Sequence, residues 1–223
     1  MLCFSDKLLV TLQYNFYINR IMIKNLILDF GKVLVDYDFE SFFRKNIPNP
    51  QRCEAVTSIL CDPETLNTFD RESKPLDKIV DDLIALHPEY EAEIHMFVEH
   101  YPEIIIGEMP GMYELLSSLK EQGLKLYGLT NWCSKVHLTM QQYPIFSLLD
   151  GRVISSEEHL IKPEPAIYQC LLDRYNLNPE ECLFADDKPV NIQGALAMGM
   201  HGIVFRNSAQ FRQELQQYLS RHV

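Results

Sequence analysis

Short apolar runs alternate with longer amphipathic stretches along most of the chain. From Met22 onward, compact runs such as NLIL and CLFA have the character of buried strands. Between them, apolar residues recur at the spacing of one helix face. The pattern predicts strands at 23–30, 124–129, 152–155, 182–185 and 202–205, and helices at 110–122, 165–175, 190–198 and 210–219.

The alternation of strands with helices determines the fold class that we expect. A strand, a helix and a further strand form a right-handed unit that builds a parallel sheet. We therefore predict an α/β fold with a Rossmann-like parallel sheet. In such sheets ligands bind beyond the carboxyl ends of the strands.

The pattern changes between the first and second predicted strands. Helix-like stretches occur at 39–46, 53–60, 76–86 and 89–101, are separated by prolines, and precede a short apolar run at 104–106. This composition indicates an inserted, all-helical segment that covers the site. The expected organisation is an N-terminal extension at 1–21, an α/β core formed by 22–37 and 107–223, and a helical cap domain at 38–106.

The first 21 residues do not resemble a signal peptide. Their apolar run at 8–12 is short and includes Thr11, the charge before it is mixed, and no small-residue cleavage site follows. We expect this extension to carry no chemistry.

Composition narrows the classes of partner. The chain has 223 residues, and at roughly 150 residues per domain this fits one core with a small insertion. Its net charge of −11 disfavours binding to a nucleic acid backbone. No apolar run reaches the roughly 18 residues of a membrane span, so we expect no membrane partner. The six cysteines form no C-x-x-C pair, which favours reduced thiols and a cytoplasmic location. Nothing in the sequence indicates an oligomeric state.

Polar side chains stand at the ends of three predicted strands. Asp29 ends the first, Thr130 and Asn131 follow the second, and Asp186 and Asp187 end the fourth. Asp29 could be a carboxylate nucleophile, or it could cap a turn or helix. Thr130 and Asn131 could hold an anionic oxygen, or they could cap the next helix.

Two further features could contribute to the same site. Lys162, in the run Ile161-Lys162-Pro163-Glu164-Pro165, either neutralises a phosphate or an aspartate or lies solvated in a loop. Asp186 and Asp187 repel each other, so a buried pair needs a cation, and oxygen ligands favour a hard ion such as Mg²⁺. A solvated acidic turn is the alternative for this pair.

The order of these motifs is more specific than any one of them. Asp29, Thr130-Asn131, Lys162 and Asp186-Asp187 occur in the order of the haloacid dehalogenase-like hydrolases. The sequence resembles the phosphatase branch of that superfamily, with a helical cap after the first motif, over about residues 22–206.

The resemblance implies a role for each residue. Asp29 matches the nucleophile that forms an aspartyl-phosphate, and Lys162 matches the cation between nucleophile and phosphate. Thr130 and Asn131 match the groups that bind the phosphoryl group. The Mg²⁺ ligands are Asp29, the carbonyl of Gly31, Asp187 and, as an outer or alternate ligand, Asp186; Asn191 orients their loop.

Gly31 departs from the usual motif of the family. The family carries a second aspartate there, which protonates the leaving oxygen, and Gly31 retains only the carbonyl. General acid catalysis is typically worth about 10²–10⁴-fold in rate, so a substitute acid or slower turnover is expected. Asp36 and Asp38 either reach the site from the hinge of the cap or are solvated there. Trp132 either lines the pocket or packs against the following helix.

Three functions follow from these features. The first is a Mg²⁺-dependent phosphatase that acts on a small phosphorylated metabolite, such as a sugar phosphate. The second is a 2-haloacid dehalogenase, which needs no metal and leaves Asp186 and Asp187 without a role. The third is a catalytically idle module that binds phosphate, for which Gly31 is the sole support.

Overall fold

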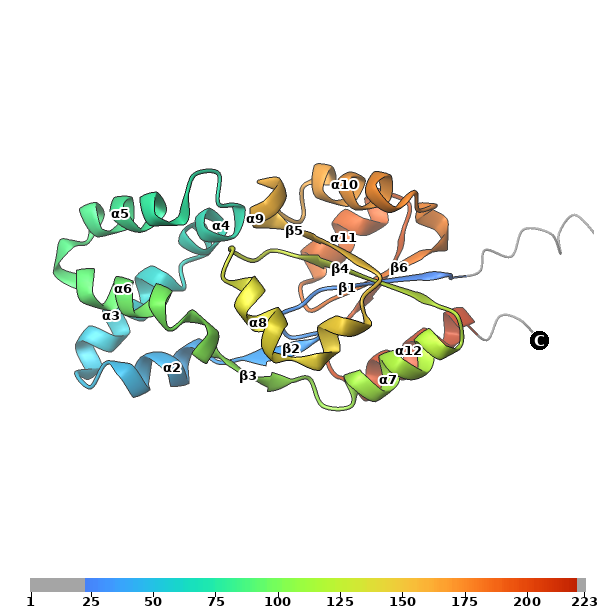
Figure 1. The fold of residues 1–223 in the computed structure, drawn as a ribbon, viewed down its shortest axis with the longest axis horizontal. Coiled ribbons are helices and arrows are strands. Elements are labelled where there is room, and N and C mark those ends of the chain that lie inside the picture. Colours follow the sequence, from blue (N-terminus) through green and yellow to red (C-terminus); the bar gives the residue numbers. More distant parts are fainter. Residues whose placement is uncertain (1–22, 220–223) are drawn as a thin grey trace, which may run out of the picture.

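The core of the protein is a five-stranded parallel sheet. The computed structural model describes residues 23–219, and Figure 1 shows the sheet among its helices. Its strands lie in the order β5, β4, β1, β6 and β7, and every neighbouring pair is parallel. Their bounds are Gly151–Ile154, Lys125–Thr130, Asn25–Leu28, Cys182–Asp186 and His201–Val204. The predicted parallel α/β fold is confirmed.

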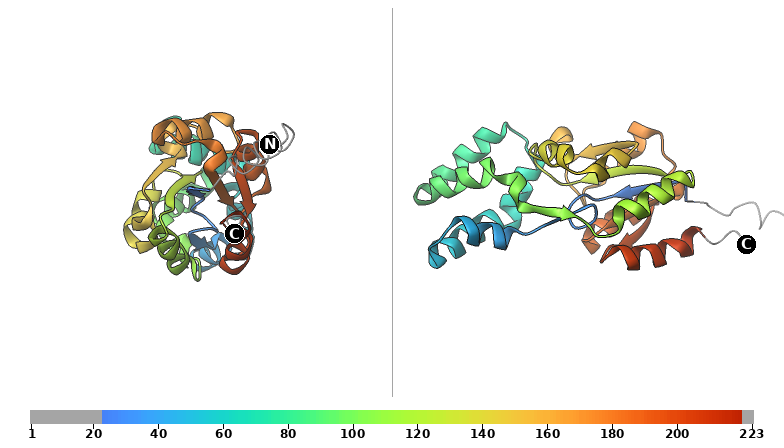
Figure 2. Two further views of the ribbon diagram at one scale, coloured as in Figure 1. Left: turned by 90° about the vertical axis from the view of Figure 1, so that its right-hand side faces the viewer. Right: turned by 60° about the horizontal axis from the view of Figure 1, so that its bottom comes forward.

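Helices cover both faces of this sheet, which explains why its central strands are mostly apolar. On one face, α10 (Pro165–Tyr175) and α11 (Pro189–Ala197) pack on inward-facing residues such as Ile27 and Phe184. On the other, α7 (Met112–Glu121) and α12 (Ser208–Leu219) pack near Leu26 and Leu183. Figure 2 shows the two layers on either side of the strands. Strands that are buried on both faces carry near-continuous apolar runs, without the alternation of a half-exposed strand.

The central position of β1 brings three strand ends together. Leu28 pairs with Gly128 of β4 on one side and with Ala185 of β6 on the other. The polar residues that follow these positions therefore meet at one edge of the sheet. The ends of the three strands carry the aspartates and the threonine of the sequence motifs.

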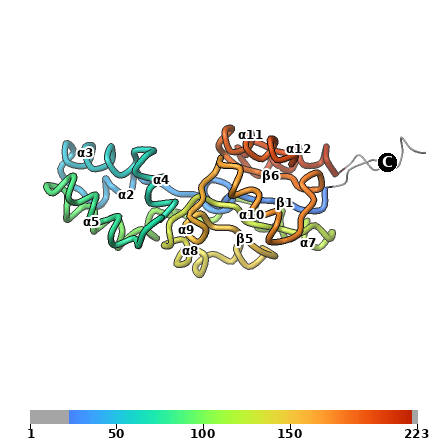
Figure 3. The backbone as a smooth tube through the Cα atoms, turned by 90° about the horizontal axis from the view of Figure 1, so that it is seen from above, coloured from blue at the N-terminus to red at the C-terminus, as the bar shows by residue number. Residues whose placement is uncertain are grey.

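A helical segment lies beyond this edge of the sheet. Along the chain it is flanked by two short strands that pair antiparallel. Figure 3 shows its helices as a group apart from the sheet. The strands are β2 (Val35–Tyr37) and β3 (Ile105–Glu108). The helices are α2 (Phe39–Asn46), α3 (Pro50–Leu60), α4 (Pro63–Arg71), α5 (Leu76–Leu86), η1 (Pro88–Tyr90), α6 (Glu91–Glu99) and η2 (Tyr101–Ile104).

Several elements differ from the sequence-based expectation. Strand β2 and helix α4 were not predicted, although Asp62 caps α4 by accepting hydrogen bonds from the backbone of Glu64 and Thr65. Pro63 occupies the first turn of α4, where a proline is tolerated because it needs no backbone donor. Strand β5, which the sequence placed at 152–155, ends at Ile154, and Ser155 already begins the short helix α9 (Ser155–Glu158).

The remaining short elements connect the core. They are α8 (Val136–Gln142), η3 (Pro144–Leu148) and η4 (Pro179–Glu181). The expected extension at 1–21 lies outside the described residues. Within residues 23–219, no helix is long and apolar enough to cross a membrane.

The helical segment has an aromatic centre of its own. Phe97 of α6 is 1% exposed, and its ring centroid lies 5.7 Å from that of Phe43, 5.9 Å from Phe69 and 5.3 Å from Tyr101. Residues from three other elements therefore pack on one ring of α6, and this packing holds the segment together.

Replacement of Phe97 by alanine should destabilise the protein. A buried phenylalanine truncated to alanine costs about 3–5 kcal/mol, because it leaves a cavity. We expect a decrease of that size in the free energy of unfolding, measured by urea denaturation. Leu86→Ala is the control, since Leu86 is 74% exposed. A similar loss in both variants would contradict the assignment of Phe97 to the centre of the segment.

Candidate active site

A buried lysine lies at the centre of the polar residues at the carboxyl ends of β1, β4 and β6. The Nζ atom of Lys162 is 2.9 Å from Oδ1 of Asp29 and 2.7 Å from Oδ2 of Asp186. It also donates a hydrogen bond of 2.9 Å to the carbonyl of Leu129. The lysine side chain is 1% exposed and that of Asp186 is fully buried. Lys162 therefore joins the ends of β1, β4 and β6 through three acceptors.

The charges of this cluster are strongly coupled. Burial alone would lower the pKa of Lys162, but Asp186 and Asp29 outweigh it and raise the pKa. Burial also opposes ionisation of Asp186, yet the ion pair with Lys162 lowers its pKa. The pKa of Asp29 is raised, mainly by burial, with Lys162 acting against the shift. Lys162 and Asp186 thus form the charged pair, and burial opposes the ionisation of Asp29 in spite of its contact with Lys162.

Two asparagines hold this cluster in place. The amide of Asn131 accepts a hydrogen bond from the backbone N–H of Lys162 at 2.8 Å and donates one to its carbonyl at 3.0 Å. The Asn191 side chain donates to both carboxylate oxygens of Asp186 at 3.0 Å. Asp186 also accepts the backbone N–H of Lys188 at 2.8 Å. Both oxygens of Asp186 are therefore engaged by protein donors.

The cluster has the donors of a site for a hard cation. One carboxylate oxygen from each of Asp29, Asp186 and Asp187 lies within 4.8 Å of the others. Three carboxylates against one lysine leave an excess of two negative charges, which a divalent cation would offset. The buried hydroxyl of Thr130 has no hydrogen-bond partner among the described residues, so an oxygen-rich ligand there would satisfy it. The residues fit Mg²⁺ bound together with an oxyanion.

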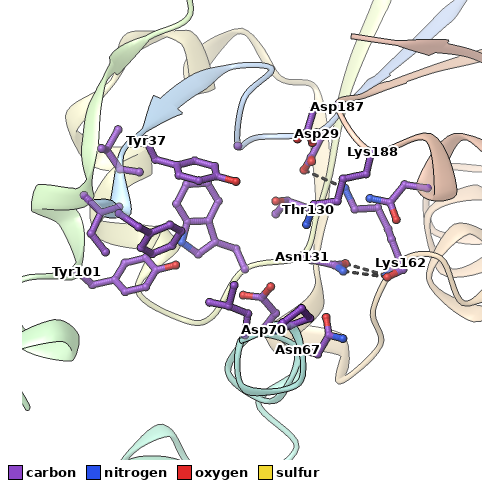
Figure 4. Close-up of a pocket in the computed structure, with 18 residues that line it drawn as sticks. Asp29, Tyr37, Asn67, Asp70, Tyr101, Thr130, Asn131, Lys162, Asp187 and Lys188 are labelled. Carbon is purple, nitrogen blue, oxygen red and sulfur yellow. Dashed lines mark hydrogen bonds and ion pairs between the residues drawn. The ribbon is translucent and has the colours of Figure 1, made fainter. Parts of the chain in front are cut away.

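The cavity in front of the cluster has a volume of about 200 Å³. Its inner end contains Asp29, Gly31, Thr130, Lys162 and Asp187, and its other walls come from the helical segment and from Trp132. Figure 4 shows Tyr37, Tyr101, Asn67 and Asp70 around the same space. Trp132 thus lines the pocket, and its ring also lies near Tyr101, with 6.5 Å between centroids.

Asp70 brings a carboxyl group from α4 into this cavity. Burial raises the pKa of Asp70 to about 7, although Lys188, Lys162 and a hydrogen bond from the Cys133 backbone oppose the shift. Its own backbone carbonyl accepts a hydrogen bond from the Ser155 hydroxyl at 2.5 Å. The core therefore fixes where the Asp70 side chain stands.

The residue after Asp70 makes a second link to the core. One guanidinium nitrogen of Arg71 lies 3.0 Å from Oε2 of Glu164 and 3.2 Å from the carbonyl of His159. Further on, the backbone N–H of Ser134 donates to Glu72 at 2.7 Å. The end of α4 is thus docked on the first residue of α9, on the loop between α9 and α10, and on the loop after β4.

Comparison with known proteins assigns the family. A family model described as "Hydrolase: haloacid dehalogenase-like hydrolase" matches residues 23–199. The chain belongs to the haloacid dehalogenase-like hydrolases.

Curated relatives of this hydrolase include phosphatases. D-ribitol-5-phosphate phosphatase of Bacteroides thetaiotaomicron is 24% identical over 206 residues, which cover 87% of this chain and 97% of that protein. Sesquiterpene phosphatase astK of Aspergillus oryzae is 33% identical over 107 residues, or 48% of this chain and 55% of that protein. The chain spans about half the length of the first curated relatives that it matches.

A solved structure shares the fold of the hydrolase. It is a haloacid dehalogenase family enzyme of Bacteroides thetaiotaomicron in complex with magnesium and inorganic phosphate. Its TM-score is 0.64 at 18% sequence identity, and the match covers 83% of this chain and 95% of that chain. The likeness at this identity concerns the fold.

The structure brings together the eight residues singled out by the sequence, but other candidates lie elsewhere. Asp36 of the hydrolase pairs with Lys32 at 2.5 Å, and Asp38 caps α2 by accepting the backbone N–H of Ser41 at 2.9 Å. Neither carboxylate lines the cavity, so the idea that either reaches the site is wrong.

Asp70 was missed in the sequence, because no helix was predicted at 63–71, although the Asp62-Pro63 start of that helix was a usable signal.

The raised pKa of Asp70 predicts a pH dependence of stability. The folded protein binds the proton of the Asp70 carboxyl group more tightly than the unfolded chain does. The stabilisation that results from this protonation is complete below about pH 4 and is lost as the pH rises through about 7. Relative to Asp70→Asn, the wild-type hydrolase should lose free energy of unfolding between about pH 5 and about pH 8. Urea denaturation at both pH values measures this. The exposed Asp77→Asn is the control, and a parallel pH profile for wild type and Asp70→Asn would refute the prediction.

Proposed function

We propose that the hydrolase is a Mg²⁺-dependent phosphatase of small phosphate monoesters. The observation that carries the proposal is the contact of Lys162 with both Asp29 and Asp186, beside the unpaired hydroxyl of Thr130. A carboxylate, a buried cation and a free hydroxyl in one pocket suit a phosphoryl group that is attacked by Asp29. The phosphatase relatives and the magnesium–phosphate complex of a fold neighbour support it.

The proposed reaction uses Asp29 as a nucleophile. One Asp29 oxygen attacks phosphorus, the bond to the alcohol oxygen breaks, and an aspartyl-phosphate forms. Lys162 balances charge between Asp29 and the phosphoryl oxygens, while Thr130 donates its hydroxyl hydrogen to one of them and Asn131 holds the Lys162 loop. Water then hydrolyses the aspartyl-phosphate and regenerates Asp29.

We assign the metal to the residues around Asp29. Asp29, the carbonyl of Gly31 and Asp187 would hold Mg²⁺, with Asp186 as an outer ligand and Asn191 orienting it. When bound, the ion would offset the carboxylate charges and polarise the phosphoryl oxygens. Asp187 suits direct coordination better than Asp186, whose oxygens already accept hydrogen bonds from Lys162, Asn191 and Lys188.

We infer that the substrate is a sugar or polyol phosphate. A cavity of about 200 Å³ has room for a phosphoryl group and a short leaving group. Its wall combines the rings of Tyr101 and Trp132 with the polar groups of Asn67 and Asp70. Aromatic faces pack on C–H groups, and the amide and carboxyl accept hydroxyl hydrogens. In this proposal residues 38–106 act as a cap domain over the core of 22–37 and 107–223.

The nucleophile variant tests the reaction itself. Asp29→Asn should lower phosphate release from a panel of sugar and polyol phosphates by about 10³-fold or more, because an amide is a poor nucleophile. The assay is release of inorganic phosphate at saturating Mg²⁺, and Asp77→Asn serves as the surface control. Undiminished release by Asp29→Asn would overturn the mechanism. Chloride release from a 2-chloroacid would favour the dehalogenase, and phosphate binding without turnover would favour the idle module.

Metal removal tests the proposed Mg²⁺ site. EDTA should abolish phosphate release, and added Mg²⁺ should restore it, because the metal-free pocket repels a phosphate dianion. Mg²⁺ should also raise the melting temperature of the wild type, since it binds the folded state alone. Asp187→Asn should reduce that thermal shift. Activity that is insensitive to EDTA would refute the metal requirement.

A further inference from the structure

The ring of Tyr37 occupies the space beside Gly31. A Cβ atom added at Gly31 would lie 2.9 Å from Cε1 of Tyr37 and 3.4 Å from its Cδ1. Any side chain at position 31 would thus project into this ring. The absence of a side chain at Gly31 is what allows the phenol of Tyr37 to stand against the first motif.

Contacts on several sides hold this ring. Lys32 places its Nζ atom 4.5 Å from the ring centroid and donates a 2.6 Å hydrogen bond to the Tyr37 carbonyl. Asp36 accepts from the same Nζ atom at 2.5 Å. The Phe39 ring also packs edge-on against the Tyr37 ring, with 5.2 Å between centroids. The direction of the phenol is therefore set by its neighbours at the end of β2.

The hydroxyl of Tyr37 enters the reaction cavity. Tyr37 lines the same cavity as Asp29, and Figure 4 shows its hydroxyl turned toward that aspartate. A tyrosine hydroxyl is protonated at neutral pH, so the Tyr37 phenol can act as a hydrogen-bond donor.

We propose that the Tyr37 hydroxyl donates a hydrogen bond to the oxygen that leaves phosphorus. This inference rests on the proposed phosphatase function. As Asp29 attacks, the electron pair of the breaking P–O bond stays on the leaving oxygen, and the Tyr37 O–H stabilises that developing charge. Solvent water supplies the proton that completes the alcohol. The water that hydrolyses the aspartyl-phosphate returns one proton to solvent, and Tyr37 stays neutral throughout.

Other groups of the cavity suit this role less well. Lys162 is committed to Asp29, Asp186 and the Leu129 carbonyl. Asp70 stands on α4, and Figure 4 draws its carboxyl group below Asn131, on the side of the cavity that α4 forms. The ring of Tyr37 contacts Gly31 of the first motif, and its hydroxyl is turned toward Asp29 in the cavity.

Tyr37→Phe tests the hydrogen bond, because it removes one oxygen and keeps the ring. The value of kcat/KM covers the step in which the alcohol leaves. For an alkyl phosphate such as glycerol phosphate, we expect kcat/KM to fall about 10²-fold. For p-nitrophenyl phosphate, whose leaving group is a good acid, it should fall less than about threefold. The control is Tyr127→Phe, which removes a phenol hydroxyl outside the cavity.

Each outcome separates this inference from the function on which it rests. Equal losses on both substrates would indicate a structural role for Tyr37 and overturn the inference, as would no loss on either. A leaving-group-dependent loss in Asp70→Asn but not in Tyr37→Phe would transfer the role to Asp70. Absence of phosphate release by the wild type on both substrates would instead remove the phosphatase function itself.

Discussion

The ion pairs of Lys162 with Asp29 and Asp186 are the constraint on which the site depends. A fully buried ammonium is costly unless it is paired and hydrogen-bonded, and here two carboxylates and a carbonyl meet its three donors. These acceptors come from different strands, so the contacts form only when β1, β4 and β6 are in register. Folding of the sheet and assembly of the reactive cluster are thus one event.

The same arrangement leaves the pocket short of positive charge. Lys162 cannot compensate Asp187 as well as its two partners, and the pKa of Asp187 is raised by burial and by Asp186. A divalent cation would remove this imbalance without a change in the protein. The buried Thr130 hydroxyl has no hydrogen-bond partner among the described residues, and a bound oxyanion would accept its hydrogen. The ligands that the site fits are thus the ones that complete its charges and hydrogen bonds.

Much of this arrangement could be predicted from the sequence, and the rest could not for physical reasons. The sheet was predictable because β1 and β6 are apolar at nearly every position, and the strand ends then placed Asp29, Thr130 and Asp187 on one edge. The cavity wall could not be predicted from the sequence, because Tyr37 and Asp70 belong to no motif. Tyr37 ends a three-residue strand too short for a periodic signal, and Asp70 reaches the cavity only through docking of α4.

The docked end of α4 has a consequence for exchanging segments between relatives. Ser155 and Glu164 follow β5 along the chain, whereas their partners at 70 and 71 lie in the helical segment between β2 and β3. The Ser155 hydroxyl bonds to a backbone carbonyl, which any residue at position 70 would supply, whereas the contact with Glu164 needs the guanidinium of Arg71. A chimera that receives another protein's helical segment without an arginine at position 71 would therefore lose the ion pair with Glu164, even if every motif residue were retained.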